Sequence, residues 1–305
     1  MRVLVTGVTG QVGGALKDTL AKIGSVYAAD RGLLDLSRPG EIAPALERIR
    51  PDLIVNAGAY TAVDRAEDEK DLAHVVNAEA PGVIARWAAG HSVPLVHFST
   101  DYVFDGSGTR PWREDDRPNP LSVYGASKLA GEDAVRTAGG PHLIIRTQWV
   151  YAASGKNFLR TIARAAADRK VLRIVNDQYG APTSARLIAD IVAQLLAPGS
   201  GTLAARFAAA NGLLNVAASG DTTWHGFAVA IVQGLKTRGV NLAVEDVRSI
   251  TTAEYPTKAR RPLNSRLDLT RLRELFGIIP QPWDDALAIE IDAVAREIFV
   301  SQLER

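Results

Sequence analysis

The residues with the clearest chemical use are a tyrosine and a lysine four positions apart, Tyr124 and Lys128. We expect them to open a helix, where residues four apart lie on one face, so that a phenol and an ammonium share one site. A free tyrosine titrates near pH ~10 and exchanges protons poorly at neutral pH. A lysine ammonium nearby favours the phenolate and brings the tyrosine pKa closer to the working range. The spacing predicts proton transfer, although an isolated Tyr-x-x-x-Lys in a sequence is more often an ordinary surface tyrosine and lysine.

A nucleotide-binding turn is predicted near the start of the chain. Residues 2–6 form a short β-branched run, typical of a buried parallel strand, and apolar residues at helical spacing begin at position 12. Glycines suit the turn between them, because a pyrophosphate must approach the backbone at the N-terminus of the helix. The predicted cofactor contacts of this turn are Gly7, Gly10, Gln11, Val12 and Gly13.

The next strand bears on the choice of cofactor. Residues 26–29 form a second predicted strand that ends in Asp30, about where the ribose-binding acid of a strand–helix–strand unit belongs. Asp30 favours NADH, because its carboxylate can accept hydrogen bonds from the ribose hydroxyls. Arg31 favours NADPH, because its guanidinium can meet a 2′-phosphate, unless it is simply a solvated side chain. The sequence leaves both cofactors open.

Strands and helices then alternate, with predicted strands at 53–55, 95–98 and 143–145 and a helical stretch near 72–87. Small residues at 57–59 would let the backbone run close beneath the cofactor. Ser99 and Thr100 follow a middle strand, and ligands of an open parallel sheet bind beyond the carboxyl ends of its strands. The Thr100 hydroxyl is therefore predicted to donate to a substrate carbonyl oxygen. A turn-capping role for both residues is the alternative.

The second half is less regular. It predicts helices at 156–167, 185–196, 223–236 and 284–299 and a strand at 171–175, while the Gly- and Ala-rich residues 198–212 are expected to form a poorly packed loop or linker. The fold class is therefore α/β: a Rossmann-type doubly wound parallel sheet with a smaller, mostly C-terminal α/β substrate lobe. We expect the first domain to span residues 1–150 with part of about 183–220. The substrate lobe then takes about 151–182 and 221–305.

Composition excludes several classes of function. Net charge of +1 gives no argument for nucleic acid or an anionic membrane as a partner. The lack of cysteine excludes disulfides, thiol nucleophiles and cysteine–zinc sites, and the five histidines show no paired metal-ligand spacing. No apolar run approaches the ~18 residues of a membrane span. With no signal-peptide pattern at the N-terminus, we expect a cytoplasmic protein.

The glycine turn, the Thr after a middle strand and the Tyr-x-x-x-Lys together resemble the extended short-chain dehydrogenase/reductase superfamily. There, a nicotinamide carries the hydride, and Ser/Thr, Tyr and Lys manage the proton. Within it, the chain resembles the dTDP-4-dehydrorhamnose reductase family at residues 10–13, 55–57, 60–64, 99–104, 176–183 and 259–265. The resemblance implies NAD(P)H-dependent reduction of the C4 keto group of dTDP-4-dehydro-6-deoxy-L-mannose to dTDP-L-rhamnose, the last step of dTDP-rhamnose synthesis.

The resemblance also implies a set of site residues. The catalytic set is Thr100, Tyr124 and Lys128, and Lys128 also binds the nicotinamide ribose. The other implied cofactor contacts are Asp35, Leu36, Ala57, Gly58, Ala59 and Ser99. The sugar pocket would be lined by Thr61, Val63, Thr100, Asp101, Tyr102 and Trp149.

Two of these assignments have simpler alternatives. Trp149 would offer a flat apolar face to a 6-deoxy sugar, unless it is a core tryptophan. The basic residues Lys258, Arg260 and Arg261 suit a nucleotide diphosphate, since arginine binds phosphate oxygens bidentately, unless they belong to a solvated loop.

One departure from the family concerns assembly. Some members dimerise through a magnesium ion bound by glutamates, and the corresponding positions here are Ala15 and Arg186, which supply no carboxylate. We therefore predict no magnesium at a dimer interface, and expect a monomer or a homodimer of another design.

Two other functions stay open from the sequence. One is a non-catalytic regulatory subunit like that of methionine adenosyltransferase, which resembles the same family; the intact Thr100, Tyr124 and Lys128 set argues against it. The other is a reductase, epimerase or dehydratase acting on a different nucleotide sugar. A dehydratase would place an acidic pair beside the threonine, whereas this chain has only Asp101 there.

Overall fold

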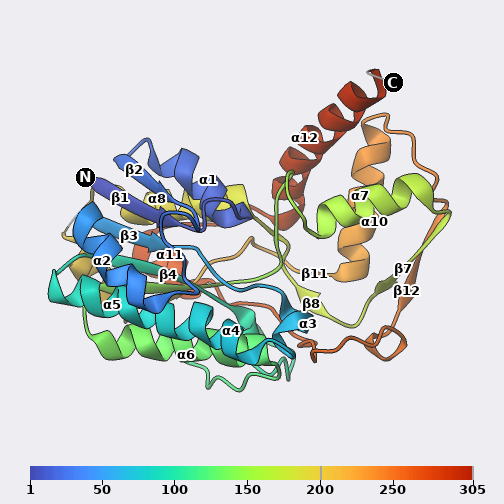
Figure 1. Ribbon diagram of the computed structural model, residues 1–305. Helices are drawn as coiled ribbons and strands as arrows, with labels where there is room; N and C mark the ends of the chain where they lie inside the picture. Colours follow the sequence, from blue (N-terminus) through green and yellow to red (C-terminus); the bar gives the residue numbers. More distant parts are fainter. Residues whose placement is uncertain (200, 304–305) are drawn as a thin grey trace.

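The computed structural model describes residues 1–199 and 201–303. A six-stranded sheet, in which every pairing is parallel, forms the larger lobe (Figure 1). Its strands are β1 (Arg2–Thr6), β2 (Ser25–Ala29), β3 (Leu53–Asn56), β4 (Leu95–Thr100), β5 (His142–Thr147) and β10 (Leu213–Asn215). The strands follow the order β10-β5-β4-β3-β1-β2. The chain first adds β2 on one side of β1 and then β3 on the other side, so the strand order reverses between β1 and β3. Ligands of doubly wound sheets bind at such a reversal.

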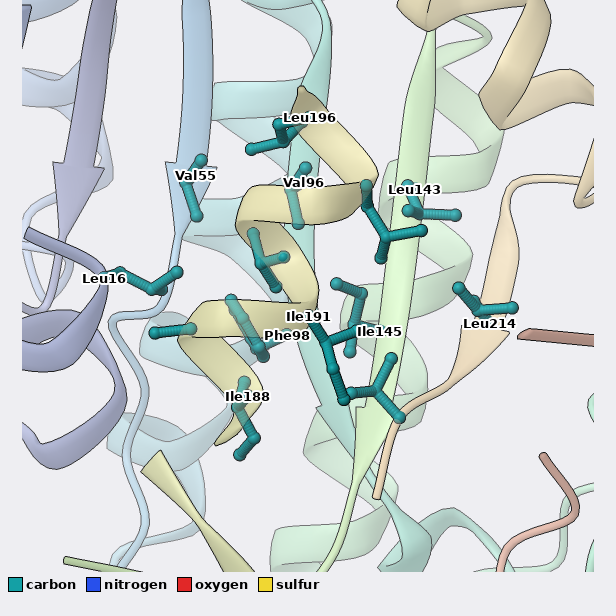
Figure 2. Packing of buried hydrophobic residues seen from close by; sticks show 14 of the residues in the cluster. Leu16, Val55, Val96, Phe98, Leu143, Ile145, Ile188, Ile191, Leu196 and Leu214 are labelled. Atoms are coloured by element: carbon teal, nitrogen blue, oxygen red, sulfur yellow. The ribbon is translucent and has the colours of Figure 1, made fainter. Parts of the chain in front are cut away.

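Helices cover both faces of this sheet because its strands are apolar on both sides. Val3 and Val5 of β1 point into one core cluster and Leu4 into the other, following the two-residue period of a strand. The first cluster is closed by α1 (Gln11–Leu20) and α8 (Ala185–Leu196); Figure 2 shows Ile188 and Ile191 of α8 over β4 and β5. The second is closed by α2 (Pro39–Ile49), α5 (Ala80–Gly90) and α6 (Val123–Ala138).

The smaller lobe has its own core. It is built from α7 (Phe158–Asp168), α10 (Trp224–Thr237), α12 (Trp283–Leu303) and the parallel pair β7 (Val171–Val175) and β12 (Asp246–Ile250). Tyr151, Leu159 and Phe227 are fully buried at its centre. Figure 1 shows these elements grouped on one side of the sheet lobe.

The remaining strands form two short pairings. β6 (Val150–Tyr151) pairs with β9 (Thr183–Ser184), and β8 (Tyr179–Gly180) pairs with β11 (Thr222–Thr223). The remaining elements are α3 (Val63–Ala66), α4 (Lys70–His74), the π-helical turn η1 (Val75–Glu79), the 3₁₀ turns η2 (Asp101–Val103) and η3 (Thr252–Glu254), α9 (Leu203–Ala209) and α11 (Thr270–Phe276). Within the described ranges, each helix is too short or too polar to cross a membrane.

The predicted Rossmann-type α/β fold is confirmed. The bounds of α7, α8, α10 and β7 lie within two residues of the predicted ones, whereas α12 ends at Leu303, four residues beyond its predicted end. The predicted loop at 198–212 is wrong. Thr202 caps α9 by accepting a hydrogen bond from the Ala205 amide, at 3.2 Å, and α9 buries Phe207 in the core under the sheet. Because alanine is a strong helix former, an Ala-rich segment needs only such a cap and one buried anchor to fold. The proposed domain division stays a prediction.

Candidate active site

Tyr124 and Lys128 occupy the first two turns of α6, as predicted. The Ser122 side chain caps this helix by accepting a hydrogen bond from the Gly125 amide, at 3.2 Å. The helix start packs tightly on η2, since a Cβ at Gly125 would lie 2.2 Å from the carbonyl oxygen of Tyr102. The rings of Tyr102 and Tyr124 meet edge to face, with centroids 5.5 Å apart. Local capping and this close approach together aim the phenol at the end of β4.

Thr100 ends β4, which packs against α6, and its side chain lies close to that phenol. The Thr100 hydroxyl donates to Asp101 Oδ1 at 3.0 Å and accepts from the Tyr102 amide at 3.2 Å. Thr100 therefore caps the following turn and also lies in the site, so the structural and the chemical interpretations are both correct. The structure brings together Thr100, Asp101, Tyr102 and Tyr124.

Lys128 is only 2% exposed, and its Nζ has no hydrogen-bond partner within the part of the chain that the structure describes. A buried ammonium without a partner is costly. Such a group suits a ligand hydroxyl, as the predicted contact with a cofactor ribose requires. Oδ2 of Asp101 and Oε1 of Gln11 are likewise buried without a partner there. Three buried polar atoms of the predicted site thus have no hydrogen-bond partner among the described residues.

Burial controls the ionisation of this site. It raises the pKa of Tyr124 above its usual range, and the charges of Asp101 and Tyr102 act in the same direction. The direction is opposite to the predicted one, because desolvation is the largest cause of the shift. Burial also lowers the pKa of Lys128 to about 8 and raises the pKa of Asp101 to about 7. Tyr124 keeps its proton at neutral pH, which is the state that a proton donor requires.

The predicted cofactor turn is a cradle without room for side chains. Gly7 has φ +67°, and a Cβ there would lie 2.7 Å from the Cα of Gly58. A Cβ on Gly13 would lie 2.2 Å from the carbonyl oxygen of Gly7. The Thr6 hydroxyl accepts from the Gly58 amide at 3.1 Å, which ties the end of β1 to the turn after β3. The backbone is therefore open to a pyrophosphate at the N-terminus of α1, and a dinucleotide fits this site.

The residues predicted to meet the adenosine lie along the same edge. Asp30 and Arg31 are both exposed, and Asp30 accepts a hydrogen bond from the Leu33 amide at 3.1 Å. Asp35 has its pKa lowered, mainly by the hydrogen bond from the Ser37 amide. Leu36 is buried against Gly58. Ala57 and Ala59 are partly buried there.

The predicted basic cluster is already ion-paired. Arg261 Nη2 contacts Asp64 Oδ2 at 2.6 Å, and Lys258 pairs with Asp68. Arg261 also lies over the ring of Tyr102, 6.0 Å from its centroid, and its Nη1 is buried without a partner among the described residues. Lys258 and Arg260 are exposed at the rim. Arg261 therefore lies beside Tyr102, whereas Lys258 and Arg260 lie at the surface.

Trp149 does not offer an open face. Its backbone has φ +45°, and its ring stacks on Trp224 with centroids 3.8 Å apart and planes 15° apart. A Cβ at Gly180 would lie 2.6 Å from the same ring. Only 9% of Trp149 is exposed. The predicted flat sugar platform is corrected to a ring that is largely covered; Thr61 is exposed and Val63 partly buried, at the start of α3.

Sequence reasoning missed Asn77. It lies in the π-helical turn η1 and donates to Ser127 Oγ and to the Tyr60 carbonyl, each at 3.0 Å, while accepting from the Tyr60 amide at 2.8 Å. These bonds join α6 to the segment after β3. A polar residue inside an apolar helical pattern was the available signal, but the register shift of a π turn decides where it points.

The two positions that carry glutamates in some relatives have other roles here. Ala15 packs on the core under the sheet, and Arg186 Nε contacts Glu290 Oε1 at 3.1 Å. Across the described ranges, no three His, Asp or Glu side chains group in a way that would hold a metal ion. The absence of magnesium from a dimer interface stays a prediction.

The parallel sheet, the glycine cradle and the Thr100, Tyr124 and Lys128 set define a Rossmann-type protein of the short-chain dehydrogenase/reductase class. The chain belongs to the family described as the RmlD substrate binding domain, whose profile matches residues 1–296. It is 41% identical to the dTDP-4-dehydrorhamnose reductase of Shigella flexneri, covering 99% of both chains. It is 47% identical to that of Burkholderia thailandensis, covering 95% of this chain and 97% of the relative.

Solved structures agree with this assignment. A dTDP-4-dehydrorhamnose reductase of Clostridium acetobutylicum superposes with a TM-score of 0.86 at 33% identity, covering 96% of this chain and 99% of the other. One of Bacillus anthracis in complex with NADP superposes with a TM-score of 0.85 at 31% identity, covering 97% and 99%. WbmG of Bordetella bronchiseptica in complex with NAD and UDP, at 18% identity and a TM-score of 0.77 over 97% and 96%, shows the shared fold alone.

Proposed function

We propose that this protein is an NAD(P)H-dependent dTDP-4-dehydrorhamnose reductase, which reduces the C4 keto group of dTDP-4-dehydro-6-deoxy-L-mannose to give dTDP-L-rhamnose. The observation that carries the proposal is the position of Thr100 at the end of β4 close to Tyr124, with the buried Lys128 one turn further along α6. The glycine cradle at the N-terminus of α1 supports dinucleotide binding. Relatives that match nearly the full chain carry this enzyme name.

The proton chemistry rests on residues of this chain. When bound, the reduced nicotinamide supplies a hydride to the carbonyl carbon. The Thr100 hydroxyl turns from Asp101 Oδ1 to donate to the carbonyl oxygen, to which Tyr124 also donates, and Tyr124 gives up its proton to the alkoxide that forms. Lys128 holds the ribose and compensates the phenolate left behind. Because burial raises the pKa of Tyr124, the phenol is protonated before the reaction, and the phenolate that remains after it is a strong base.

The proposed nucleotide-sugar contacts are chosen by which polar side chains near Thr100 already have hydrogen-bond or ion-pair partners and which do not. Asp101 and Tyr102 adjoin Thr100, and Arg261 reaches the same place with a free N–H edge for a diphosphate oxygen. Lys258 must exchange Asp68 for phosphate, so its contribution is smaller. The edge of Trp149, with Thr61 and Val63, completes the sugar pocket in this proposal.

The cofactor choice, the assembly and the location are further parts of the proposal. Asp30 and Arg31 are both exposed at the adenosine end, which supports use of NADH as well as NADPH. We propose a monomer or a homodimer without a metal bridge, because Ala15 and Arg186 supply no carboxylate. We expect the enzyme to act in the cytoplasm.

The test follows the absorbance of NADPH and NADH with dTDP-4-dehydrorhamnose generated in situ. Rapid oxidation in the wild type, lost in Tyr124→Phe, is the expected result, and the two rates give the cofactor preference. If the wild type binds NADPH and oxidises none, the reductase proposal fails. Turnover of other nucleotide sugars and binding to methionine adenosyltransferase then decide between the remaining functions.

A further inference from the structure

A buried charge pair lies one helical turn beyond Lys128. Glu132 of α6 is 0% exposed and Arg146 of β5 is 1% exposed. Arg146 Nε donates to Glu132 Oε1 at 2.9 Å and Nη2 donates to Oε2 at 2.7 Å, which is the bidentate geometry of the strongest ion pairs. The Ser99 hydroxyl also donates to Oε1, at 2.6 Å. The Glu132 carboxylate is thus almost fully coordinated by hydrogen-bond donors.

This pair connects the elements that carry the site. Ser99 precedes Thr100 on β4, Glu132 follows Lys128 on α6, and Arg146 ends β5 beside both. Arg146 also donates to the Glu114 carbonyl at 3.1 Å. With its hydroxyl committed to Glu132, Ser99 serves the site through this support, and its predicted cofactor contact stays a prediction.

The charges around Lys128 give the pair a second effect. Glu132 lies four residues after Lys128 and is the anion that favours the charged form of the lysine. His97 of β4 is fully buried, and desolvation together with Lys128 holds its pKa well below the usual range, so it adds no charge. The elements packed on α6 carry further titratable groups, namely Asp64, Arg65, Lys70, Asp71, His74, Glu79, Arg86, Asp101, Tyr102 and His142.

We propose that Glu132 is a positioning residue of the reductase site, whose carboxylate, locked by Arg146 and Ser99, keeps the Lys128 ammonium charged and holds α6 against β4. This inference rests on the proposed function for its catalytic meaning. In this proposal Glu132 contacts neither substrate nor cofactor and acts through Lys128. A buried carboxylate that served Arg146 alone would leave the ionisation of Lys128 unchanged when it was removed.

The variant Glu132→Gln keeps the size of the side chain and removes its charge. Without this anion the charged form of Lys128 is disfavoured, so its pKa falls further below about 8. We expect both kcat and NADPH affinity to decline at a pH lower by roughly 1 unit than in the wild type. NADPH affinity is measured by fluorescence titration across the alkaline range, and kcat in the same buffers.

Two further variants separate electrostatics from folding. Glu132→Gln leaves Arg146 as an unpaired buried cation, so the protein loses thermal stability; Glu132→Gln with Arg146→Gln removes both charges and recovers part of it. The double variant also removes the Arg146 cation, which opposes the charged form of Lys128, so we expect its alkaline limb to lie between that of Glu132→Gln and that of the wild type. Arg136→Gln is the matched control: it removes the half-exposed partner of Glu132, at 3.3 Å, and leaves the pH profile unchanged.

Unshifted pH profiles in both charge-removing variants, with only a lower melting temperature, would overturn the proposal and leave Glu132 a structural residue. The titration of NADPH affinity keeps this outcome distinct from failure of the proposed function. If the wild type reduces no dTDP-4-dehydrorhamnose, the reductase proposal fails. The NADPH titration still measures the effect of Glu132 on cofactor binding.

Discussion

The two sides of the candidate site differ in how their charged and polar groups are partnered. On the sheet side, Lys128 and Asp101 are buried and each has a polar atom without a partner among the described residues. On the side of the loop around 258–261, Lys258 and Arg261 already form ion pairs with aspartates of the segment 64–68. A ligand therefore completes the first side but must compete with carboxylates on the second.

This difference assigns different work to each side. Buried, unpartnered groups are held in place before the ligand arrives, so a ligand that pairs them gains the full strength of each hydrogen bond. On the loop side, the exposed Lys258–Asp68 pair contributes little when it forms and little when it exchanges, whereas Arg261 also offers a buried Nη1 to a ligand. We expect chemistry to depend on the sheet side and substrate affinity to depend on the loop side.

The largest expected effect is on the sheet side, in Tyr124→Phe. Loss of the positioned proton donor should lower kcat by ~10²–10⁴, while the NADPH dissociation constant changes little because the ring is kept. Steady-state turnover and a binding titration measure the two quantities. Turnover near that of the wild type would remove Tyr124 from the proton step.

The loop side is tested by comparing Arg261→Gln with Lys258→Gln. Arg261 carries a buried free N–H edge, and a charge-assisted hydrogen bond is worth ~1.5–3 kcal/mol, so KM for the nucleotide sugar should rise by about tenfold or more. Lys258 is exposed and paired, so its replacement should change KM by less than about fivefold. Equal effects of the two substitutions, or a loss confined to kcat, would break the comparison.

A third test concerns the tight backbone of the sheet side. A Cβ on Gly13 would lie 2.2 Å from the Gly7 carbonyl oxygen, whereas a Cβ on Gly14 would lie 3.4 Å from that of Val8. Gly13→Ala should lower the free energy of unfolding by ~1–3 kcal/mol and weaken NADPH binding. Gly14→Ala is the matched control in the same helix and should be neutral or stabilising. Urea denaturation measures both, and equal stability of the two variants would contradict the cradle.

A last test of the sheet side is the pH dependence of stability that Asp101 contributes. Burial raises its pKa to about 7 in the folded protein, above the ~3.9 of an unfolded chain. Between these values the folded state binds a proton that the unfolded state releases, so stability falls as pH rises across this window. Asp101→Asn should remove that decline, and its melting temperature relative to the wild type should rise from pH ~4 to pH ~7. A difference that stays constant with pH would show that Asp101 is charged throughout.

Local patterns in the sequence determined much of this protein. The strand, glycine turn and helix at the N-terminus, the cap and spacing of Tyr124 and Lys128, and the helices after residue 156 each depend on contacts within a few residues. Periodicity and capping read such contacts directly. The Rossmann-type sheet followed because alternating strands and helices have few ways to pack.

Only the tertiary structure decided the partners of the charged and aromatic groups. Arg261 meets Asp64, Trp149 meets Trp224 and Glu132 meets Arg146 across separate elements, and residues 198–212 lead into the sixth strand rather than forming a loose loop. The net pKa of Tyr124 likewise depends on burial by the whole site rather than on the lysine four residues away. Desolvation and long-range pairing are set by how the elements pack, which no local spacing encodes.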